Sequence, residues 1–169
     1  MSDAIDVEGE IFTRTTVDGR FVENVRRPAT AAALGLEPHP EGGWYRRTWT
    51  APDTVSVTTA DGATAIRPAA TLIHFFLAAG ESSAWHRVTS TEIWLWHGPG
   101  RIRLQSGGFD DLPVDGEIVT LGPAVAQAEQ AQATIRPHEW QRTLPGPDDV
   151  LVSCLVSPGF DFADFTMLD

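Results

Sequence analysis

Short candidate strands separated by turn-forming residues dominate this chain, and they constrain its fold more than any other feature. Runs rich in Val, Ile, Thr, Trp and Phe recur along the sequence, and Gly, Pro, Asp or Ser residues separate them. Many short strands at this spacing are typical of an antiparallel sandwich or barrel. The predicted strands cover residues 44–49, 54–59, 71–77, 83–88, 92–96, 101–105, 117–121, 133–135 and 150–157.

Helical patterns are scarce in comparison. Residues 28–36 predict one short helix, because Pro28 suits a first helical turn, the alanines favour helix and Gly35 can end it. Residues 123–134 are rich in Ala and Gln and form either a short helix or an ordered loop. We therefore expect an all-β fold with one or two short helices.

The length and composition indicate one globular domain. The chain has 169 residues, of which 42% are hydrophobic and 21% charged, which is enough to bury a proper core. No linker divides the sequence. We expect a barrel domain over residues 28–169, preceded by an N-terminal arm or edge strand over residues 1–27.

The charge balance excludes some partners. Lys and Arg total 12 and Asp and Glu total 23, so the net charge is −11. Binding to nucleic acid or to an anionic membrane needs many cations, so neither is expected. The expected partner is a small molecule, and an anionic one would require local arginines.

The cysteine content and the hydropathy pattern predict a cytoplasmic protein. Cys154 is the one cysteine of the sequence and cannot form an intramolecular disulfide, so we interpret it as a buried structural thiol. The first residues lack the basic and apolar regions of a signal peptide. No apolar run approaches the ~20 residues of a membrane helix.

The first candidate site surrounds two adjacent glycines in the segment HPEGGWYR. Glycine lets the backbone bend sharply before a strand begins, and loops at strand ends often carry function. The alternative is a turn whose polar side chains are solvated. The site candidates of this segment are His39, Glu41, Tyr45 and Arg46.

The second candidate site lies in the segment that runs from Gly80 to Gly100. His86 and Glu92 are an even number of residues apart, and Glu92 shares a strand face with Trp94. A histidine and a carboxylate in one cavity suit either a metal ion or acid–base chemistry. The alternative is a hydrogen-bonded histidine and a surface glutamate. Ser83 and Trp94 are further candidates for ligand binding, with Trp94 as an apolar wall of the pocket.

Two later segments complete the candidates. In residues 137–142, Trp140 could wall a pocket and Gln141 could bond a ligand, or Trp140 could belong to the core. In residues 157–165, we interpret the alternating phenylalanines as core and leave the role of Asp161 open. The sequence has no Gly-rich phosphate loop, no zinc-like cysteine cluster and no Gly-x-Ser-x-Gly elbow.

Four blocks together resemble the DUF985 family, which is also called the cupin-5 family. They are HPEGGWYRRT, SSAWHRVTSTEIWLWHGPG, PHEWQ and SPGFDFADF, and they follow the family's order from about Leu34 to Met167. The resemblance implies a double-stranded β-helix (jelly-roll) cupin barrel similar to the RmlC-like deoxysugar epimerases. It also implies a homodimer, and it brings no settled general activity.

The metal-binding pattern of the wider cupin group is only partly present. Gly80 is followed by five residues and then His86, and Glu92 fits the glutamate of the pattern, but Val88 stands where a second histidine is expected. Gln141 or Arg142 stands near the place of the last metal histidine.

A transition metal normally takes three or four ligands, so we expect no metal cofactor. The alternative is a divalent transition metal held by His86, Glu92 and His74, provided that His74 faces inward. The chain also departs from the family at Arg47, where an acidic residue is common.

The leading functional hypothesis is a metal-free epimerase or isomerase that acts on a carbohydrate-like substrate. One of His86 and Glu92 would be the base for proton transfer next to a carbonyl, and the other would orient it. Tyr45 would be the acid, and Arg46 would stabilise the anion. Alternatives are a non-catalytic ligand-binding module and a metal-dependent oxygenase or isomerase.

Overall fold

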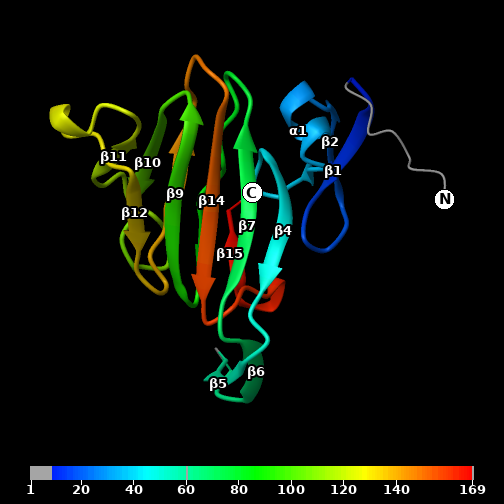
Figure 1. The fold of residues 1–169 in the computed structure, drawn as a ribbon. Helices are drawn as coiled ribbons and strands as arrows, with labels where there is room; N and C mark the ends of the chain where they lie inside the picture. Colours follow the sequence, from blue (N-terminus) through cyan, green and yellow to red (C-terminus); the bar gives the residue numbers. More distant parts are fainter. Residues whose placement is uncertain (1–8, 60, 169) are drawn as a thin grey trace.

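Two antiparallel β-sheets face each other and form the body of the protein (Figure 1). The computed structural model describes residues 9–59 and 61–168. One sheet has six strands in the order β12-β9-β14-β7-β4-β3, and the other has five in the order β11-β10-β13-β8-β15. The expected all-β class is confirmed.

The two sheets are accompanied by two separate hairpins and three short helical segments. The six-stranded sheet contains β3 (Glu37–Pro38), β4 (Trp44–Thr50), β7 (Thr71–Leu77), β9 (Thr91–Pro99), β12 (Gln132–Ile135) and β14 (Val150–Ser157). The five-stranded sheet contains β8 (His86–Val88), β10 (Ile102–Ser106), β11 (Ile118–Leu121), β13 (Gln141–Leu144) and β15 (Phe165–Met167). The hairpins are β1 (Ile11–Thr15) with β2 (Phe21–Arg26) and β5 (Thr54–Thr58) with β6 (Thr64–Pro68). The helical segments are α1 (Ala29–Ala33), η1 (Val125–Gln127) and η2 (Phe162–Asp164).

The core lies between the two sheets and is built by alternating side chains. In β10, Ile102 and Leu104 are each only 2% exposed, whereas Arg103 between them is exposed. Successive side chains point to opposite faces of a strand, so every second residue reaches the core. Burial of a side chain of this size stabilises the fold by roughly 1.5–3 kcal/mol.

Strand β7 lies between β14 and β4 in the six-stranded sheet, and its residues are apolar except for Thr71 and His74. The reason is that part of this strand is covered on both faces. Phe75 joins the core between the sheets, whereas Phe76 packs on the outer face with Trp44. Ala31 of α1 and Phe12 of the β1–β2 hairpin cover that outer patch (Figure 1).

The strand predictions are most accurate for the central strands. Those for residues 71–77 and 150–157 agree with β7 and β14 in full. The prediction for 83–88 is wrong in its first half, because the N–H groups of Ser83 and Ala84 bond to Thr143 Oγ1 and to the Glu41 carbonyl instead of joining a ladder. The short strands β3, β6, β13 and β15 were not predicted.

The helical segments are shorter than expected. α1 begins after Pro28 as its N-cap, and Gly35 follows it with a φ of +62°. The ambiguous residues 123–134 contain both a turn of 3-10 helix, η1, and the start of β12. No helix in the described part of the chain is long and apolar enough to cross a membrane.

The N-terminal region forms a hairpin on the outer face of the six-stranded sheet. Of the expected arm over residues 1–27, residues 1–8 lie outside the described residues, and β1 pairs with β2 in most of the rest. Arg14 of this hairpin is buried and donates a hydrogen bond to the Gly43 carbonyl at 3.3 Å. The hairpin is therefore attached to the glycine turn that precedes β4.

Candidate functional site

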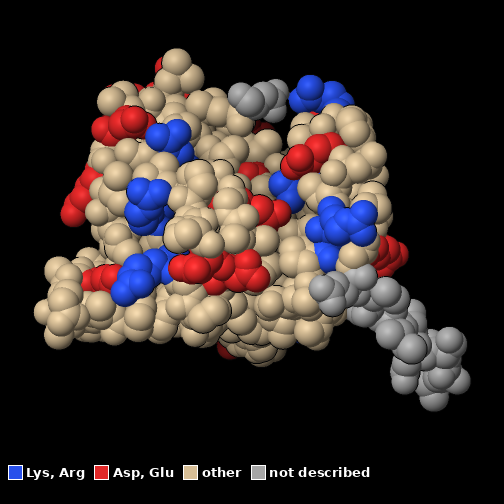
Figure 2. Space-filling model, turned by 90° about the horizontal axis from the view of Figure 1, so that it is seen from above, with Lys and Arg blue, Asp and Glu red and all other residues tan. Residues whose placement is uncertain are grey.

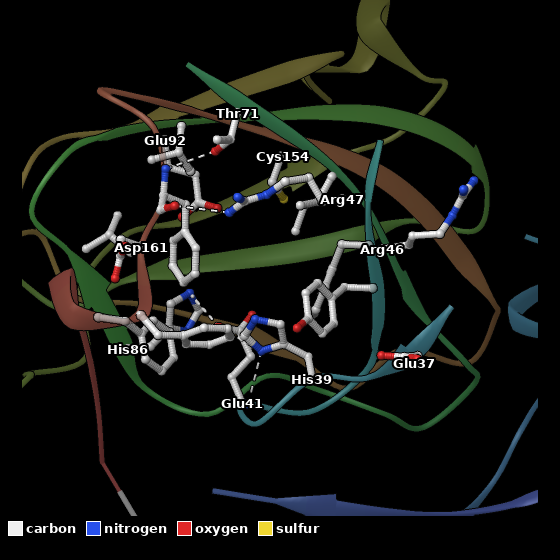
Figure 3. Close-up of a pocket in the computed structure, with 18 of the residues that line it drawn as sticks. Glu37, His39, Glu41, Arg46, Arg47, Thr71, His86, Glu92, Cys154 and Asp161 are labelled. Carbon is white, nitrogen blue, oxygen red and sulfur yellow. Dashed lines mark hydrogen bonds and ion pairs between the residues drawn. The ribbon is translucent and has the colours of Figure 1, made fainter. Parts of the chain in front are cut away.

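A cavity of about 600 Å³ lies between the two sheets (Figure 3). Strands β4, β7, β9 and β14 supply one wall, and β8 and β15 supply the other. Its polar lining residues are Glu37, His39, Glu41, Tyr45, Arg46, Arg47, Thr71, His86, Glu92, Cys154 and Asp161. Its apolar lining consists mainly of Ile73, Phe75, Val88, Val156, Phe160, Phe162 and Phe165.

Two glycines let the turn before β4 pack directly on the neighbouring backbone. Gly42 has a φ of +115°, and a Cβ there would lie 2.2 Å from the Ser82 carbonyl oxygen. Gly43 has a φ of +69°, and its Cβ would lie 2.8 Å from the Phe76 carbonyl oxygen. Only glycine fits these positions without strain, which supports the sequence-based interpretation of this turn.

This packing brings a carboxyl group to the histidine of β8. The Ala84 N–H donates to the Glu41 carbonyl at 2.7 Å, so the turn is attached to the segment that leads into β8. Glu41 Oε2 then lies 3.3 Å from His86 Nε2. His86 therefore has Glu41 as its direct partner, whereas Glu92 was the partner expected from the sequence.

The protonation state of His86 follows from its contacts. Its Nδ1 lies 2.8 Å from the Ala84 carbonyl oxygen, and because a carbonyl only accepts, Nδ1 carries the hydrogen. Burial lowers the pKa of His86 to about 4. Burial, together with the charge of Glu92, raises the pKa of Glu41 well above its usual range. These shifts favour a neutral imidazole and the protonated form of Glu41, so the contact between Glu41 Oε2 and His86 Nε2 is arranged to hold one proton between them.

His39 is a second neutral histidine beside this pair. Its Nδ1 accepts a hydrogen bond from the Glu41 N–H at 3.2 Å, which leaves Nε2 to carry the proton. Burial, and then the charges of His86 and Arg14, lower the pKa of His39 to about 3. Its ring packs edge-on against Tyr45, with 4.5 Å between the ring centroids. His39 therefore fixes the turn and orients the tyrosine.

Glu92 is the second buried carboxyl group of the cavity. Gln141 Nε2 donates to Glu92 Oε2, and Trp94 Nε1 donates to Gln141 Oε1 at 2.8 Å. Because an indole only donates, Trp94 fixes the amide so that its NH₂ group faces the carboxylate. Burial raises the pKa of Glu92 to about 7, although hydrogen bonds from Gln141 and Cys154 lower it in part. Glu92 is therefore about half ionised at neutral pH.

Three phenylalanines of the C-terminal segment, Phe160, Phe162 and Phe165, cover one side of the cavity, and we call them the aromatic roof. Phe160, Phe162 and Phe165 contact one another with ring centroids 4.9–5.9 Å apart. Phe165 stacks on His86 at 5.8 Å. The Phe160 N–H donates to Thr71 Oγ1 at 2.9 Å, which fixes the segment to β7. These phenylalanines were predicted to be core residues, but they face the cavity.

The two arginines of β4 point in different directions (Figure 3). Arg46 borders the cavity, but its guanidinium points away from it. Arg47 reaches across the cavity and donates to the Phe160 carbonyl at 3.0 Å. Arg46, the arginine expected to stabilise an anion, thus directs its guanidinium out of the cavity, whereas Arg47 directs its guanidinium into it. The alternation of the strand gives the signal, because Tyr45 and Arg47 share a face.

His74 does not join the cavity residues. It lies between Ile73 and Phe75, which both line the cavity, so its side chain points to the outer face of the sheet. There it faces His97, with 6.3 Å between the ring centroids. The condition for a metal site of His86, Glu92 and His74, an inward-facing His74, is therefore not met.

Four other candidates for ligand binding serve the structure around the cavity instead of lining it. Ser83 Oγ accepts hydrogen bonds from the N–H and the hydroxyl of Thr143. Trp140 donates its indole N–H to the Asp110 carbonyl at 2.8 Å and is buried. Trp94 and Gln141 stand behind Glu92 and orient it. The expected tryptophan walls are thus replaced by phenylalanine and tyrosine rings.

The positions that hold a metal in other cupins do not form a metal site here. Val88 is apolar, and both ends of the Gln141 amide are already hydrogen-bonded. His86 Nε2 faces a protonated carboxyl group. Within residues 9–59 and 61–168, no group of three or more His, Cys, Asp or Glu side chains is placed to hold a metal ion. The donor set does not fit a transition metal, which takes three or four such ligands.

Comparisons with known proteins point to one family. The family model Cupin_5, described as "Cupin superfamily (DUF985)", matches residues 29–168. A hypothetical protein from Leishmania major is 29% identical, with a TM-score of 0.69 over 82% of this chain and 84% of that chain. A protein from Shewanella oneidensis is 28% identical, with a TM-score of 0.69 over 83% and 82%. No curated protein matches the chain.

More distant structures share the fold alone. An oxalate decarboxylase variant from Bacillus subtilis is 14% identical, with a TM-score of 0.52 over 78% of this chain and 29% of that chain. Oxalate decarboxylase from Lactobacillus farciminis is also 14% identical, with a TM-score of 0.54 over 79% and 33%. The cupin barrel expected from the sequence resemblance is confirmed.

Proposed function

The chain belongs to the Cupin_5 (DUF985) family of the cupin superfamily, and on that premise we propose that its cavity is the site of an epimerase or isomerase. The reaction moves a proton at a carbon next to a carbonyl group of a small molecule. The observation that carries this proposal is the buried pair of Glu41 Oε2 and His86 Nε2, 3.3 Å apart, with His86 Nδ1 fixed on a carbonyl. Such a pair suits proton transfer because its proton can lie on either partner.

The first step requires a base in the cavity. The proton of the pair passes to His86 Nε2, and the carboxylate of Glu41 then takes the proton from the substrate carbon. The electron pair of the C–H bond becomes the C=C bond of an enol, and the carbonyl electron pair moves to oxygen. Enclosure in a cavity of low dielectric strengthens the stabilisation of this charge by the imidazolium.

The second group is an acid that meets the developing oxygen anion. Glu92 fits this role, because its pKa of about 7 keeps a large protonated fraction at neutral pH. Burial and the charge of Glu37 raise the pKa of Tyr45, so its phenol remains a donor. Inversion requires that Tyr45 donates a proton to the same carbon from the opposite face, while the enol oxygen returns its proton to Glu92 and the carbonyl group forms again. If Glu41 instead returns its proton to the former carbonyl carbon and the hydroxyl group on the neighbouring carbon loses its proton, the carbonyl group moves to that carbon.

The experiment is deuterium exchange from solvent. The protein is incubated in D₂O with a panel of aldoses, ketoses, uronates and 2-keto acids, and NMR follows the C–H signals next to the carbonyl. We expect catalysed exchange for at least one compound, and the same rate in the presence of EDTA. Loss of exchange with EDTA favours a metal-dependent enzyme. Binding of a panel member without any exchange favours the non-catalytic ligand-binding module and overturns the proposal.

Three further predictions accompany this function. A carbohydrate-like substrate, a homodimeric state and a cytoplasmic location come from the sequence and stay part of the proposal. The aromatic roof supports the first of them, because the apolar faces of sugar rings pack on aromatic rings. Sedimentation analysis of the purified protein tests the homodimer.

A further inference from the structure

We propose that Arg47 is the anion-binding residue of this cavity, and that the natural ligand is a small carboxylate with a ring-shaped or apolar body. The inference rests on the proposed function, since it takes the same cavity as the ligand site. To the proposed function it adds the chemical class of the ligand, which is a carboxylate. Among the described residues, Arg47 is the arginine whose guanidinium reaches into the cavity (Figure 3).

Most N–H donors of the Arg47 guanidinium remain available for a ligand. It donates one hydrogen bond, to the Phe160 carbonyl at 3.0 Å, although a guanidinium carries five N–H groups. Across residues 9–59 and 61–168, no carboxylate lies within ion-pair distance of Arg47. By contrast, Arg67 binds Asp164 through two nitrogens, at 2.7 and 3.2 Å. A planar guanidinium with free donors matches a carboxylate in two-point contact.

The acidic groups near the roof are engaged elsewhere. Asp164 is held by Arg67, and Asp161 Oδ1 accepts a hydrogen bond from the Ala163 N–H at 2.8 Å as the cap of η2. The remaining acid at this edge is Glu37, whose charge raises the pKa of Tyr45 whereas that of Arg47 lowers it. Glu37 and Arg47 therefore act on Tyr45 in opposite senses.

The charge of the whole protein makes a local cation necessary for an anionic ligand. The net charge is −11, and Figure 2 shows basic and acidic side chains interspersed over the face seen from above. Burial favours the protonated forms of Glu41 and Glu92, which reduces their negative charge. Glu37 and Asp161 also line the cavity, so a bound carboxylate needs the guanidinium of Arg47 to offset their charge.

The body of the ligand is defined by the roof and the size of the cavity. Phe160, Phe162 and Phe165 present ring surfaces beside the guanidinium, and about 600 Å³ is within the usual range for small-molecule sites. With its carboxylate on Arg47, a ligand places its ring under the roof and its reacting carbon toward Glu41 and Glu92. Both a sugar acid and an aromatic acid have this shape.

Binding measurements with matched acids and amides test the inference. The probes are glucuronate against glucuronamide and 3-phenylpropanoate against 3-phenylpropanamide, measured by isothermal titration calorimetry. The variant is Arg47→Met, which keeps the stem of the side chain. Its matched control is Arg46→Met, which removes the neighbouring guanidinium that points away. Thermal unfolding confirms that both variants are folded.

In the wild type and in Arg46→Met, we expect at least one acid to bind ten-fold or more tightly than its amide. In Arg47→Met, that acid should bind no better than its amide. The pair that discriminates identifies the body as sugar-like or aromatic. Equal binding of acids and amides, discrimination that survives in Arg47→Met, or no binding by either acid overturns the inference. If Arg47 discriminates but no deuterium exchange occurs, the proposed reaction fails and the anion site remains.

Discussion

The cavity and the outer face of the six-stranded sheet hold the same kinds of side chain but differ in chemistry. The cavity has His86, Glu92 and Arg47, and the outer face has His74 and Arg46 on the same strands or their neighbours. In the cavity, burial brings the pKa of Glu92 to about 7 and that of His86 to about 4. Enclosure between the two sheets, and not residue type, thus shifts the pKa values of the cavity residues away from their ordinary values.

The histidines on the outer face of the six-stranded sheet have fewer polar partners than those of the cavity. His97 Nε2 lies 2.6 Å from Ser153 Oγ, and His74 packs against His97. Burial, then the charges of His97 and Arg46, lowers the pKa of His74. No carboxyl partner of the described chain is paired with His74, whereas His86 has Glu41. Substitutions on the two faces should therefore have different consequences.

The largest expected effect is on catalysis by His86. His86→Asn keeps a nitrogen donor for the Ala84 carbonyl but removes Nε2, and we expect deuterium exchange to fall by about 10²–10⁴-fold. The matched outer variant His74→Asn should retain exchange within about two-fold of the wild type. Equal losses of deuterium exchange in both variants, or full exchange by His86→Asn, would contradict the difference between the cavity and the outer face.

The next effect is on stability and concerns Glu92. Below pH 4.5 both the folded and the unfolded state carry its proton. As the pH rises from 4.5, the ordinary pKa of a glutamate, toward about 7, the unfolded state loses the proton first, so the folded state loses stability. The full difference is about 3 kcal/mol, at about 1.4 kcal/mol for each pH unit.

Glu92→Gln removes this pH dependence, because the amide does not titrate. We expect the variant to gain stability over the wild type, by up to about 3 kcal/mol, between pH 4 and pH 8. Urea unfolding at pH 4, 6 and 8 measures the difference. A constant difference across this range would show that Glu92 is not buried as described.

A smaller effect is expected from the hydrogen bonds behind Glu92. Gln141→Leu leaves the buried Trp94 N–H without its partner, which costs about 1–3 kcal/mol, whereas Glu92 keeps the hydrogen bond from Cys154. Ser153→Ala on the outer face removes one partner of His97 and should cost about 0.5 kcal/mol. Chemical unfolding of both variants at one pH compares them, and a reversed order would contradict the comparison.

The sequence was sufficient for the fold and for part of the site. The central strands could be predicted because β7 and β14 are long and strongly apolar, and His86 and Glu92 lie in the cavity as their spacing indicated. Period-two alternation gives the relative orientation of residues in a strand but not which face is inside. For this reason the sequence alone does not decide which of Arg46 and Arg47 faces the cavity, nor in which direction His74 points.

Tertiary packing determines which face of β4 points into the cavity. Trp44 is buried on the outer face by α1 and the β1–β2 hairpin, so Tyr45 and Arg47 must face the cavity. The partnership of Glu41 with His86 also depends on a contact between distant segments, the turn before β4 and the segment before β8. No pattern within either segment reveals it. The glycines of the turn were the available signal.

The most direct test of the account is the protonation state of His86. ¹⁵N NMR of protein labelled in its histidine rings should show, at pH 7, a neutral His86 ring with the proton on Nδ1. The ring should become charged only near pH 4, because burial lowers its pKa to about that value. A His86 ring that carries its proton on Nε2, or that titrates near 6.5, the ordinary pKa of a histidine, would contradict the proton-sharing pair on which the proposed function depends.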